Sequence, residues 1–342
     1  RAYQQIPVGI TVEGANILTR SLILFGQGAI RCHPYVLKEM DAARSGDLKS
    51  FDEAFWGHVG YTLSNAARAV VMGLTGSHFV AVPDAGGKGV APETRRYYQQ
   101  LTRFSAAFAF LADISMGTLG GALKRKEKLS ARLGDILSLM YLASAALKRY
   151  EDEGRQAADA PLLHWVIWDC MFKAQNAFEG VIANFPNRLF ATLLRRIVVF
   201  PLGRPYFVPS DQLGHEVATL LINPSATRDR LTSDVYLPTD VEEPVGALEA
   251  ALHATIEAEP VEAKVRRAIK SGQFKPGLLV GGGVDALYDV AVAAGIISRD
   301  EHALITRRGE LRDKVIRVDD FPYDFGLRQA LDGQADEARK AA

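Results

Sequence analysis

The strongest periodic pattern in the chain is Tyr97-Tyr98-Gln99-Gln100-Leu101-Thr102-Arg103-Phe104-Ser105-Ala106-Ala107-Phe108-Ala109-Phe110-Leu111. Its large apolar residues at positions 97, 101, 104, 108 and 111 are separated alternately by four and three residues, which is the repeat of one face of an α-helix. The same spacing returns at Leu133, Ile136, Met140, Ala143 and Leu147. Two long amphipathic helices are typical of a helical bundle. The sequence therefore predicts an all-α fold.

Helical patterns also lie on both sides of this pair. Residues 16–44 predict a helix broken near His33-Pro34, because proline disfavours helical conformation in the residue before it. The glycine-rich segment 76–94 predicts a connection. The remaining helices are predicted at Phe51–Leu74, Pro161–Asn184, Leu189–Phe200, Val245–Glu257, Pro260–Lys270, Val284–Ala294 and Ser298–Lys314.

Composition excludes several classes of function. The 342 residues are 48% hydrophobic and 23% charged, and Lys plus Arg equals Asp plus Glu at 40 each, so no net field favours nucleic acid. Cys32 and Cys170 are the only cysteines and have no C-x-x-C partner, which argues against a metal site of the zinc type and fits a reducing, cytoplasmic compartment. No apolar run is long enough to span a bilayer.

The best candidate for chemistry lies near the start of the chain, in Ile10-Thr11-Val12-Glu13-Gly14-Ala15-Asn16-Ile17-Leu18-Thr19-Arg20. Glu13 follows an apolar run and precedes a helical pattern, so it is predicted at a loop-to-helix junction. A carboxylate that loses hydration there suits the role of a general base, and Gly14 would let a ligand approach the backbone. On spacing alone, the more ordinary interpretation is a solvated carboxylate near a helix N-terminus.

The junction Val12-Glu13-Gly14-Ala15-Asn16, the helical pattern from Ile17 to Ile30 and the run Leu123–Asp135 together resemble the C-terminal third of a bacterial acyl-CoA dehydrogenase. More narrowly, they resemble the large long-chain enzyme of fatty-acid β-oxidation, which has extra helices after its dehydrogenase core. The similarity extends from Gly9 to about Asp320.

This resemblance implies roles for four residues. Glu13 would be the catalytic base that removes the α-proton of an acyl-CoA, while hydride leaves the β-carbon for FAD and trans-2-enoyl-CoA forms. Gly14 would lie beside the thioester, and Ala15 and Asn16 would lie where the family contacts the flavin. The chain departs from the family pattern at Val12, where an aromatic residue is usual, and at Ala15, where a threonine is usual.

The resemblance also implies an organisation and a set of partners. Residues 1–46 would end the catalytic helical domain, 47–204 would form a second helical bundle, 205–324 a C-terminal helical region and 325–342 a disordered tail. The chain begins at Arg1 without a methionine and would be a fragment, inactive alone, that lacks most of the flavin site. The expected partners are a medium- or long-chain acyl-CoA substrate, an electron-transfer flavoprotein as acceptor, and further copies of the chain in a homo-oligomer.

Two other groups of residues have a functional and a structural interpretation. His58 could act as a ligand or base, but a single histidine on such a helix is more often packed. The basic runs at Lys124–Lys128 and Arg195-Arg196 could meet an anionic membrane or CoA phosphates, or could be ordinary solvated helix residues. The rival hypothesis for the whole chain is therefore a non-catalytic helical module for protein interaction or for docking at the inner membrane.

Overall fold

The computed structural model describes residues 20, 25–82, 89–275 and 284–318. This part of the chain contains helices, turns and connections without a strand, which confirms the all-α prediction. The contacts divide the chain into two compact units, Arg1–Thr227 and Arg228–Ala342. The domain boundaries predicted after residues 46, 204 and 324 remain predictions. Within the described part, no helix is both long enough and apolar enough to cross a membrane.

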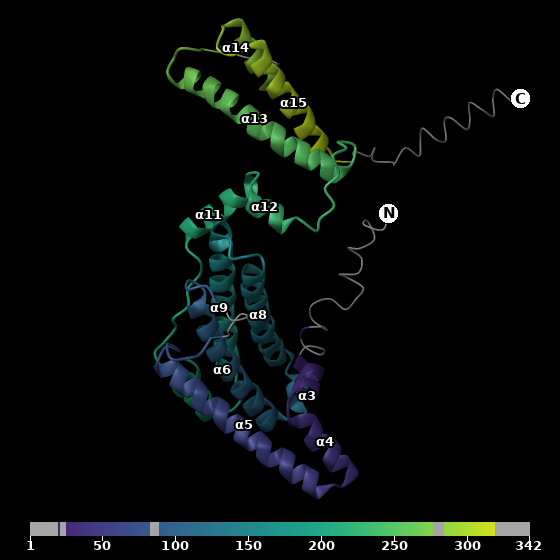
Figure 1. Ribbon diagram of the computed structural model, residues 1–342, viewed down its shortest axis with the longest axis vertical. Coiled ribbons are helices and arrows are strands. Elements are labelled where there is room, and N and C mark those ends of the chain that lie inside the picture. Colours follow the sequence, from purple (N-terminus) through teal and green to yellow (C-terminus); the bar gives the residue numbers. More distant parts are fainter. Residues whose placement is uncertain (1–19, 21–24, 83–88, 276–283, 319–342) are drawn as a thin grey trace, which may run out of the picture. The chain divides into compact units, whose positions relative to one another are not determined.

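The first unit is a bundle of long helices with short helices around it (Figure 1). Its elements, in chain order, are α3 (Gly28–Cys32), α4 (Val36–Ser45), α5 (Leu48–Leu74), α6 (Arg95–Leu119), α7 (Ala122–Arg125), α8 (Glu127–Asp152), η2 (Ala157–Asp159), α9 (Ala160–Ala183), α10 (Arg188–Leu193), the π-helix η3 (Leu194–Val199) and α11 (Asp211–Ile222). The short helix α12 (Ala226–Leu231) spans the boundary between the two units in the chain.

Local chemistry explains where α3, α4 and α5 begin and end. The chain leaves α3 at His33, whose backbone is extended as expected before Pro34. Gly46 ends α4 in the left-handed conformation at φ 72°, which glycine adopts without a steric penalty. Asp47 then caps α5 by accepting the Ser50 backbone N–H at 3.1 Å. These signals fix the sharp reversal between α4 and α5.

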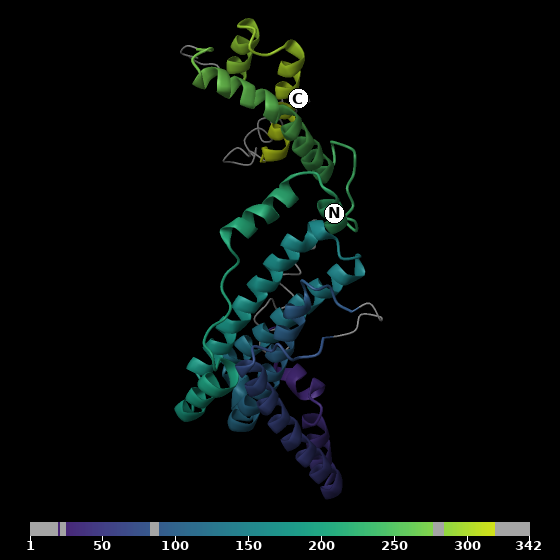
Figure 2. The same ribbon diagram turned by 60° about the vertical axis from the view of Figure 1, so that its left-hand side comes forward.

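The apolar stripes found in the sequence face one another across α6, α8 and α9, which run side by side in Figures 1 and 2. Phe104, Leu111, Leu133, Ile136 and Leu147 are each at most 2% exposed. Burial of side chains of this size stabilises the fold by about 1.5–3 kcal/mol each. Most of the residues that the helical spacing singles out on α6 and α8 therefore lie in the bundle core.

A buried arginine connects α6 to the end of η3. Arg103 is 6% exposed, and its Nη2 donates to the Val199 carbonyl oxygen at 2.5 Å. Its guanidinium also lies 5.9 Å from the centre of the Phe200 ring. Burial lowers the pKa of Arg103, and the neighbouring Tyr206 partly opposes this effect. A cation at the last carbonyls of a helix is favourable, so Arg103 holds η3 against the bundle.

The second unit contains α13 (Pro244–Lys270), α14 (Val284–Ala293) and α15 (Arg299–Ile316) around a separate apolar core. The prediction of two helices, at 245–257 and 260–270, is wrong, because α13 continues through Pro260. A proline in a helix removes one backbone donor. Ala258 and Val261 on either side are 0% and 5% exposed, so burial of this face offsets the lost hydrogen bond.

Candidate functional site

The residues predicted for catalysis, Glu13, Gly14, Ala15 and Asn16, lie outside the described residues. The structure does describe Arg20, a few positions later in the chain. Arg20 Nε lies 2.9 Å from Asp135 Oδ1 on α8.

A second contact also ties the backbone at Arg20 to α8. A Cβ atom at Gly134 would lie 2.8 Å from the Arg20 carbonyl oxygen, so this close approach requires a glycine. Further along, Phe25 is 3% exposed and packs edge-on against Phe108 of α6, with ring centres 6.3 Å apart. The bundle thus holds the chain shortly after the predicted base.

A polar hollow of about 410 Å³ lies beside the contact between Arg20 and α8. It is lined by Arg132, Asp135, Ser138, Leu139, Lys173 and Ala177 from α8 and α9. Burial raises the pKa of Asp135, while Arg20 and Arg132 act in the opposite direction. Lys173 is paired with Asp169 at 2.7 Å. The hollow therefore contains charges of both signs that largely compensate one another.

A second group of polar side chains gathers where α4, α5 and α6 meet. His33, His58 and Asp113 place one ring nitrogen or carboxylate oxygen each within 4.8 Å of the others. His33 Nε2 lies 3.0 Å from Asp113 Oδ1, and His58 Nε2 lies 3.7 Å from the same oxygen. His58 Nδ1 is 2.8 Å from Glu39 Oε1, and the Thr62 hydroxyl donates to Asp113 Oδ2 at 2.7 Å.

The hydrogen bonds determine which nitrogen of His33 carries its proton. His33 Nδ1 accepts the backbone N–H groups of Tyr35 and Val36 at 3.2 and 3.1 Å. Since Nδ1 accepts, Nε2 bears the proton of the neutral ring and donates it to Asp113. His33 lies two residues before Tyr35, the N-cap of α4, and its ring accepts the backbone N–H groups of Tyr35 and Val36. It thereby tethers the start of that helix to α6.

The same geometry limits the cluster as a metal site. Coordination through His33 Nε2 would replace the proton that Asp113 accepts, leaving a ring without any proton. Without His33, the three groups offer two ligand atoms, His58 Nε2 and Asp113 Oδ1. A bound transition metal ordinarily takes at least three ligand atoms from a protein, so these two are too few. His58 does have the carboxylate partner typical of a ligating histidine. The arrangement is better explained as a hydrogen-bond network that joins three helices.

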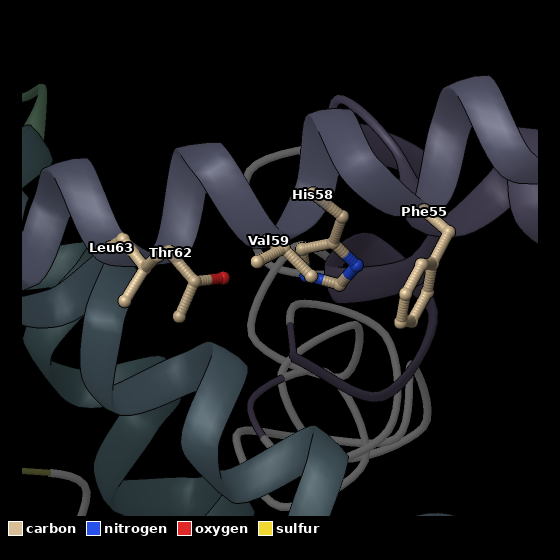
Figure 3. A pocket seen from close by; sticks show the side chains of 5 residues that line it. All are labelled: Phe55, His58, Val59, Thr62 and Leu63. Atoms are coloured by element: carbon tan, nitrogen blue, oxygen red, sulfur yellow. The ribbon is translucent and has the colours of Figure 1, made fainter.

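One edge of this network opens into an apolar hollow of about 260 Å³ (Figure 3). Phe55, His58, Val59, Thr62 and Leu63 line it, all from α5. Ligand pockets ordinarily occupy about 300–1,000 Å³ and enclose most of the ligand, so this hollow is smaller than a usual ligand site. Neither hollow has the form of a flavin site, because the first is the face of one helix and the second is a shallow space between two helices that is lined by charges of both signs.

Sequence reasoning singled out His58 but did not find its partners. His33, Glu39 and Asp113 are 25, 19 and 55 positions away in the chain, and the cluster forms only when α4 and α6 pack against α5. The one local signal is the position of His33, directly before the helix break at Pro34, where a side-chain cap is expected. The convergence on Asp113 has no signature in the sequence.

Comparison with known protein families gives a match that covers most of the chain. Residues 30–321 match the family described as acyl-CoA dehydrogenase, C-terminal, bacterial type. The match begins after Glu13 to Asn16, so it does not bear on their roles. No solved structure matches the chain. This match agrees with the resemblance found in the sequence, and it includes both bundles of helices. The chain therefore belongs to the bacterial-type acyl-CoA dehydrogenase C-terminal family.

Proposed function

We propose that the chain is the C-terminal part of an FAD-dependent enzyme that oxidises medium- or long-chain acyl-CoA to trans-2-enoyl-CoA in fatty-acid β-oxidation. The family match over residues 30–321 carries this proposal, since it supports a function of the acyl-CoA dehydrogenase type. The family generally uses FAD. The chain length of the substrate and the role of Glu13 come from the resemblance of the N-terminal segment.

In this proposal Glu13 removes the α-proton of the acyl thioester. That proton is weakly acidic, so its removal requires a carboxylate within hydrogen-bond reach and donors directed at the thioester oxygen. The backbone N–H of Glu13 would supply one donor, and Gly14 would allow the thioester to lie close to the backbone. FAD, whose predicted neighbours are Ala15 and Asn16, would be held mainly by parts of the enzyme outside this chain.

The described bundle would then position the base. Arg20 is fixed to Asp135, and Phe25 is buried beside Phe108, so the segment that follows Glu13 is held at two points. A base that is displaced by about 1 Å can lose on the order of a hundredfold in rate. We therefore assign the first bundle a supporting role in the same reaction.

The decisive test is Glu13→Gln in the complete enzyme. The variant should retain its flavin absorbance and lose acyl-CoA oxidation, because glutamine has the same shape but cannot accept the proton. Activity within a few-fold of the parent would show that Glu13 is not the base. As a companion measurement, the 342-residue chain alone should be colourless and should not respond to a long-chain acyl-CoA.

The proposal includes the partners implied by the resemblance. Electrons would pass to an electron-transfer flavoprotein, the enzyme would be a homo-oligomer, and it would act in the cytoplasm. Mixing the complete enzyme with acyl-CoA and candidate acceptors, and following flavin reoxidation, would identify the acceptor.

The second candidate function is docking at an anionic membrane surface, and one observation favours it. Ala191 and Leu194 of α10 and η3 are buried in the bundle, but Leu189 and Leu193 are 80% and 47% exposed. The neighbouring Arg195 and Arg196 are also exposed. Exposed leucines beside basic residues are the composition of helices that lie in a membrane interface.

Charge reversal tests this second candidate. Arg195→Glu combined with Arg196→Glu should weaken binding to vesicles that contain anionic lipid, since each basic residue contributes about 1 kcal/mol at such a surface. Lys38→Glu combined with Lys49→Glu is the matched control, because it makes the same change in net charge at exposed residues outside both basic runs. Equal binding by both variants and the parent chain would exclude this docking surface.

A further inference from the structure

A chain of three hydrogen-bonded side chains joins the starts of α6 and α9, two helices of the first unit (Figure 1). Tyr97, near the start of α6, is 9% exposed, and its hydroxyl oxygen lies 2.8 Å from Nδ1 of His164, near the start of α9. The two rings meet edge to face with their centres 5.6 Å apart. Trp168, one turn further along α9, hydrogen-bonds to the same Tyr97 hydroxyl.

The donors and acceptors determine where His164 carries its proton. The indole N–H of Trp168 can only donate, so the Tyr97 oxygen accepts from it. The Tyr97 O–H group then needs an acceptor of its own, and His164 Nδ1 is the atom at hydrogen-bond distance. Since Nδ1 accepts, the ring is neutral and carries its proton on Nε2. The hydrogen bonds therefore run in one direction, from Trp168 through Tyr97 to His164.

A second proton on His164 would break this chain of hydrogen bonds. The charged ring has an N–H group at both nitrogens, so Nδ1 would change from an acceptor into a donor. The Tyr97 oxygen would then face two donors, and its own proton would lose the acceptor that it has in the described structure. A buried polar group without a partner is unfavourable. The folded bundle therefore disfavours protonation of His164.

The immediate surroundings of His164 act in the same direction. Burial lowers the pKa of His164 below its ordinary value of 6.5, and Glu93, in the turn before α6, partly opposes this effect. Glu93 itself accepts the hydroxyl of Tyr150 on α8 at 3.0 Å. Both α6 and α9 begin at this end, and the positive end of a helix dipole disfavours a further cation.

The other charged groups near this end of α9 have partners or are exposed. Glu151 of α8 is paired with Arg155 at 2.5 Å. Asp159, directly before α9, accepts the Thr227 hydroxyl at 2.6 Å. The titratable residues of α11, which packs against α9, are all exposed: Asp211, His215 and Glu216. Glu93 is thus the charged group that acts on the ring, and it acts less strongly than burial.

We propose that Trp168, Tyr97 and His164 form an acid-sensitive latch, which holds the starts of α6 and α9 together at neutral pH and releases them when His164 is protonated. Further along the same two helices, the rings of Phe104 and Phe178 lie 5.5 Å apart and do not titrate. Mild acid therefore loosens one end of this pair of helices and leaves the other end packed. This inference does not depend on the proposed function.

The variant His164→Asn separates the hydrogen bond from the titration, because the Asn side-chain oxygen can accept the Tyr97 O–H but takes up no proton. The contribution of the neutral ring is complete above pH 6.5 and is lost as the pH falls from 6.5 toward the lower folded-state pKa. In this window the unfolding constant of the parent chain, divided by that of His164→Asn, should rise by up to about tenfold per pH unit. Urea denaturation of the 342-residue chains at several pH values measures both constants.

His215→Asn is the matched control, since His215 is exposed on α11 of the same unit. The ratio formed with this control should stay level. A level ratio for His164→Asn, or one that falls on acidification, would overturn the proposal. Tyr97→Phe provides a second test if His164→Asn does not fold. It removes the donated proton, so the parent chain should exceed it in stability at neutral pH and lose this advantage below pH 6.5. An advantage that is the same at every pH would also overturn the latch.

Thiol labelling tests whether the release is local. Cys170 lies on α9 and is 6% exposed, and in a Cys32→Ser background it is the only thiol of the chain. Without denaturant, dithiodipyridine should label the parent chain several-fold faster than His164→Asn in mild acid, and the two rates should agree at neutral pH. Comparison at the same pH cancels the ionisation of the thiol itself. Equal rates in mild acid would show that His164 does not release α9.

Discussion

Asp113 is a buried carboxylate whose neighbours account for its position. It is 7% exposed and accepts hydrogen bonds from His33 and Thr62, while His58 lies nearby. A buried carboxylate is tolerated when its oxygens are paired. The two donors come from the turn before α4 and from α5, so this one residue joins both to α6.

Asp113→Ala should therefore destabilise the first unit by about 3 kcal/mol, because the buried donors of His33 and Thr62 would lose their acceptor. Urea denaturation followed by circular dichroism measures the effect. Asp169→Ala is a suitable control, since Asp169 pairs with Lys173 at a half-exposed position. A similar loss in both variants would show that the network contributes nothing beyond an ordinary ion pair.

The Asp47 cap at the start of α5 makes the stability of the folded chain depend on pH, and the direction of this dependence follows from the pKa of Asp47. Hydrogen bonds from the Ser50 side chain and backbone lower the pKa of Asp47 below its ordinary value of 3.8. The charged cap is thus favoured in the folded state, and its contribution is present above pH 3.8 and lost as the pH falls through the folded-state pKa. Asp47→Asn retains a cap but does not titrate.

The melting temperature of the parent chain should accordingly exceed that of Asp47→Asn at neutral pH, and the difference should shrink below pH 3.8. Thermal melts at several pH values measure it. A difference that grows as the pH falls would contradict the assignment.

At the scale of elements, two glycines on neighbouring helices should respond differently to the same change. A Cβ at Gly134 of α8 would meet the Arg20 backbone oxygen at 2.8 Å, whereas a Cβ at Gly180 of α9 would meet the flexible Arg132 side chain at 2.8 Å. Within a helix, glycine to alanine otherwise stabilises by about 0.5–1 kcal/mol.

We expect Gly180→Ala to be neutral or stabilising and Gly134→Ala to be destabilising, because a backbone atom cannot move aside as a side chain can. In the complete enzyme, Gly134→Ala should also reduce turnover, since it displaces the segment that follows Glu13. Denaturation and steady-state kinetics measure both effects. Equal stability of the two variants would count against the backbone contact at Arg20.

Elements are also where sequence-based prediction was most and least successful. The 3–4 spacing from Tyr97 and from Leu133 predicted α6 and α8, because burial of one helix face imposes that repeat. Pro260 led to the wrong break in α13, since the local cost of a proline was outweighed by packing of Ala258 and Val261. The network at Asp113 was not predictable, because its members meet only through tertiary packing. The roles of Glu13, Gly14, Ala15 and Asn16 stay predictions.

At the scale of the whole molecule, each of the two compact units has its own apolar core. A unit with a separate core unfolds cooperatively by itself. We expect calorimetry of the 342-residue chain to show two unfolding transitions, one for each unit. Asp113→Ala should lower the temperature of the transition that belongs to the first unit, and a shorter chain that ends after Leu231 should keep that transition. A single transition in the whole chain, lost in the shorter one, would show that neither unit is independent.

Arg103 also has a consequence for how the protein is made. The carbonyl that receives its hydrogen bond belongs to Val199, 96 positions later in the chain. At a synthesis rate of about 5–20 residues per second, the Arg103 side chain would remain hydrated for roughly 5–20 s after its own synthesis. Until η3 has left the ribosome, the Arg103 guanidinium on α6 has no Val199 carbonyl to bind, and its burial in the core is unfavourable. The nascent bundle therefore stays open until nearly all of its first unit has been translated.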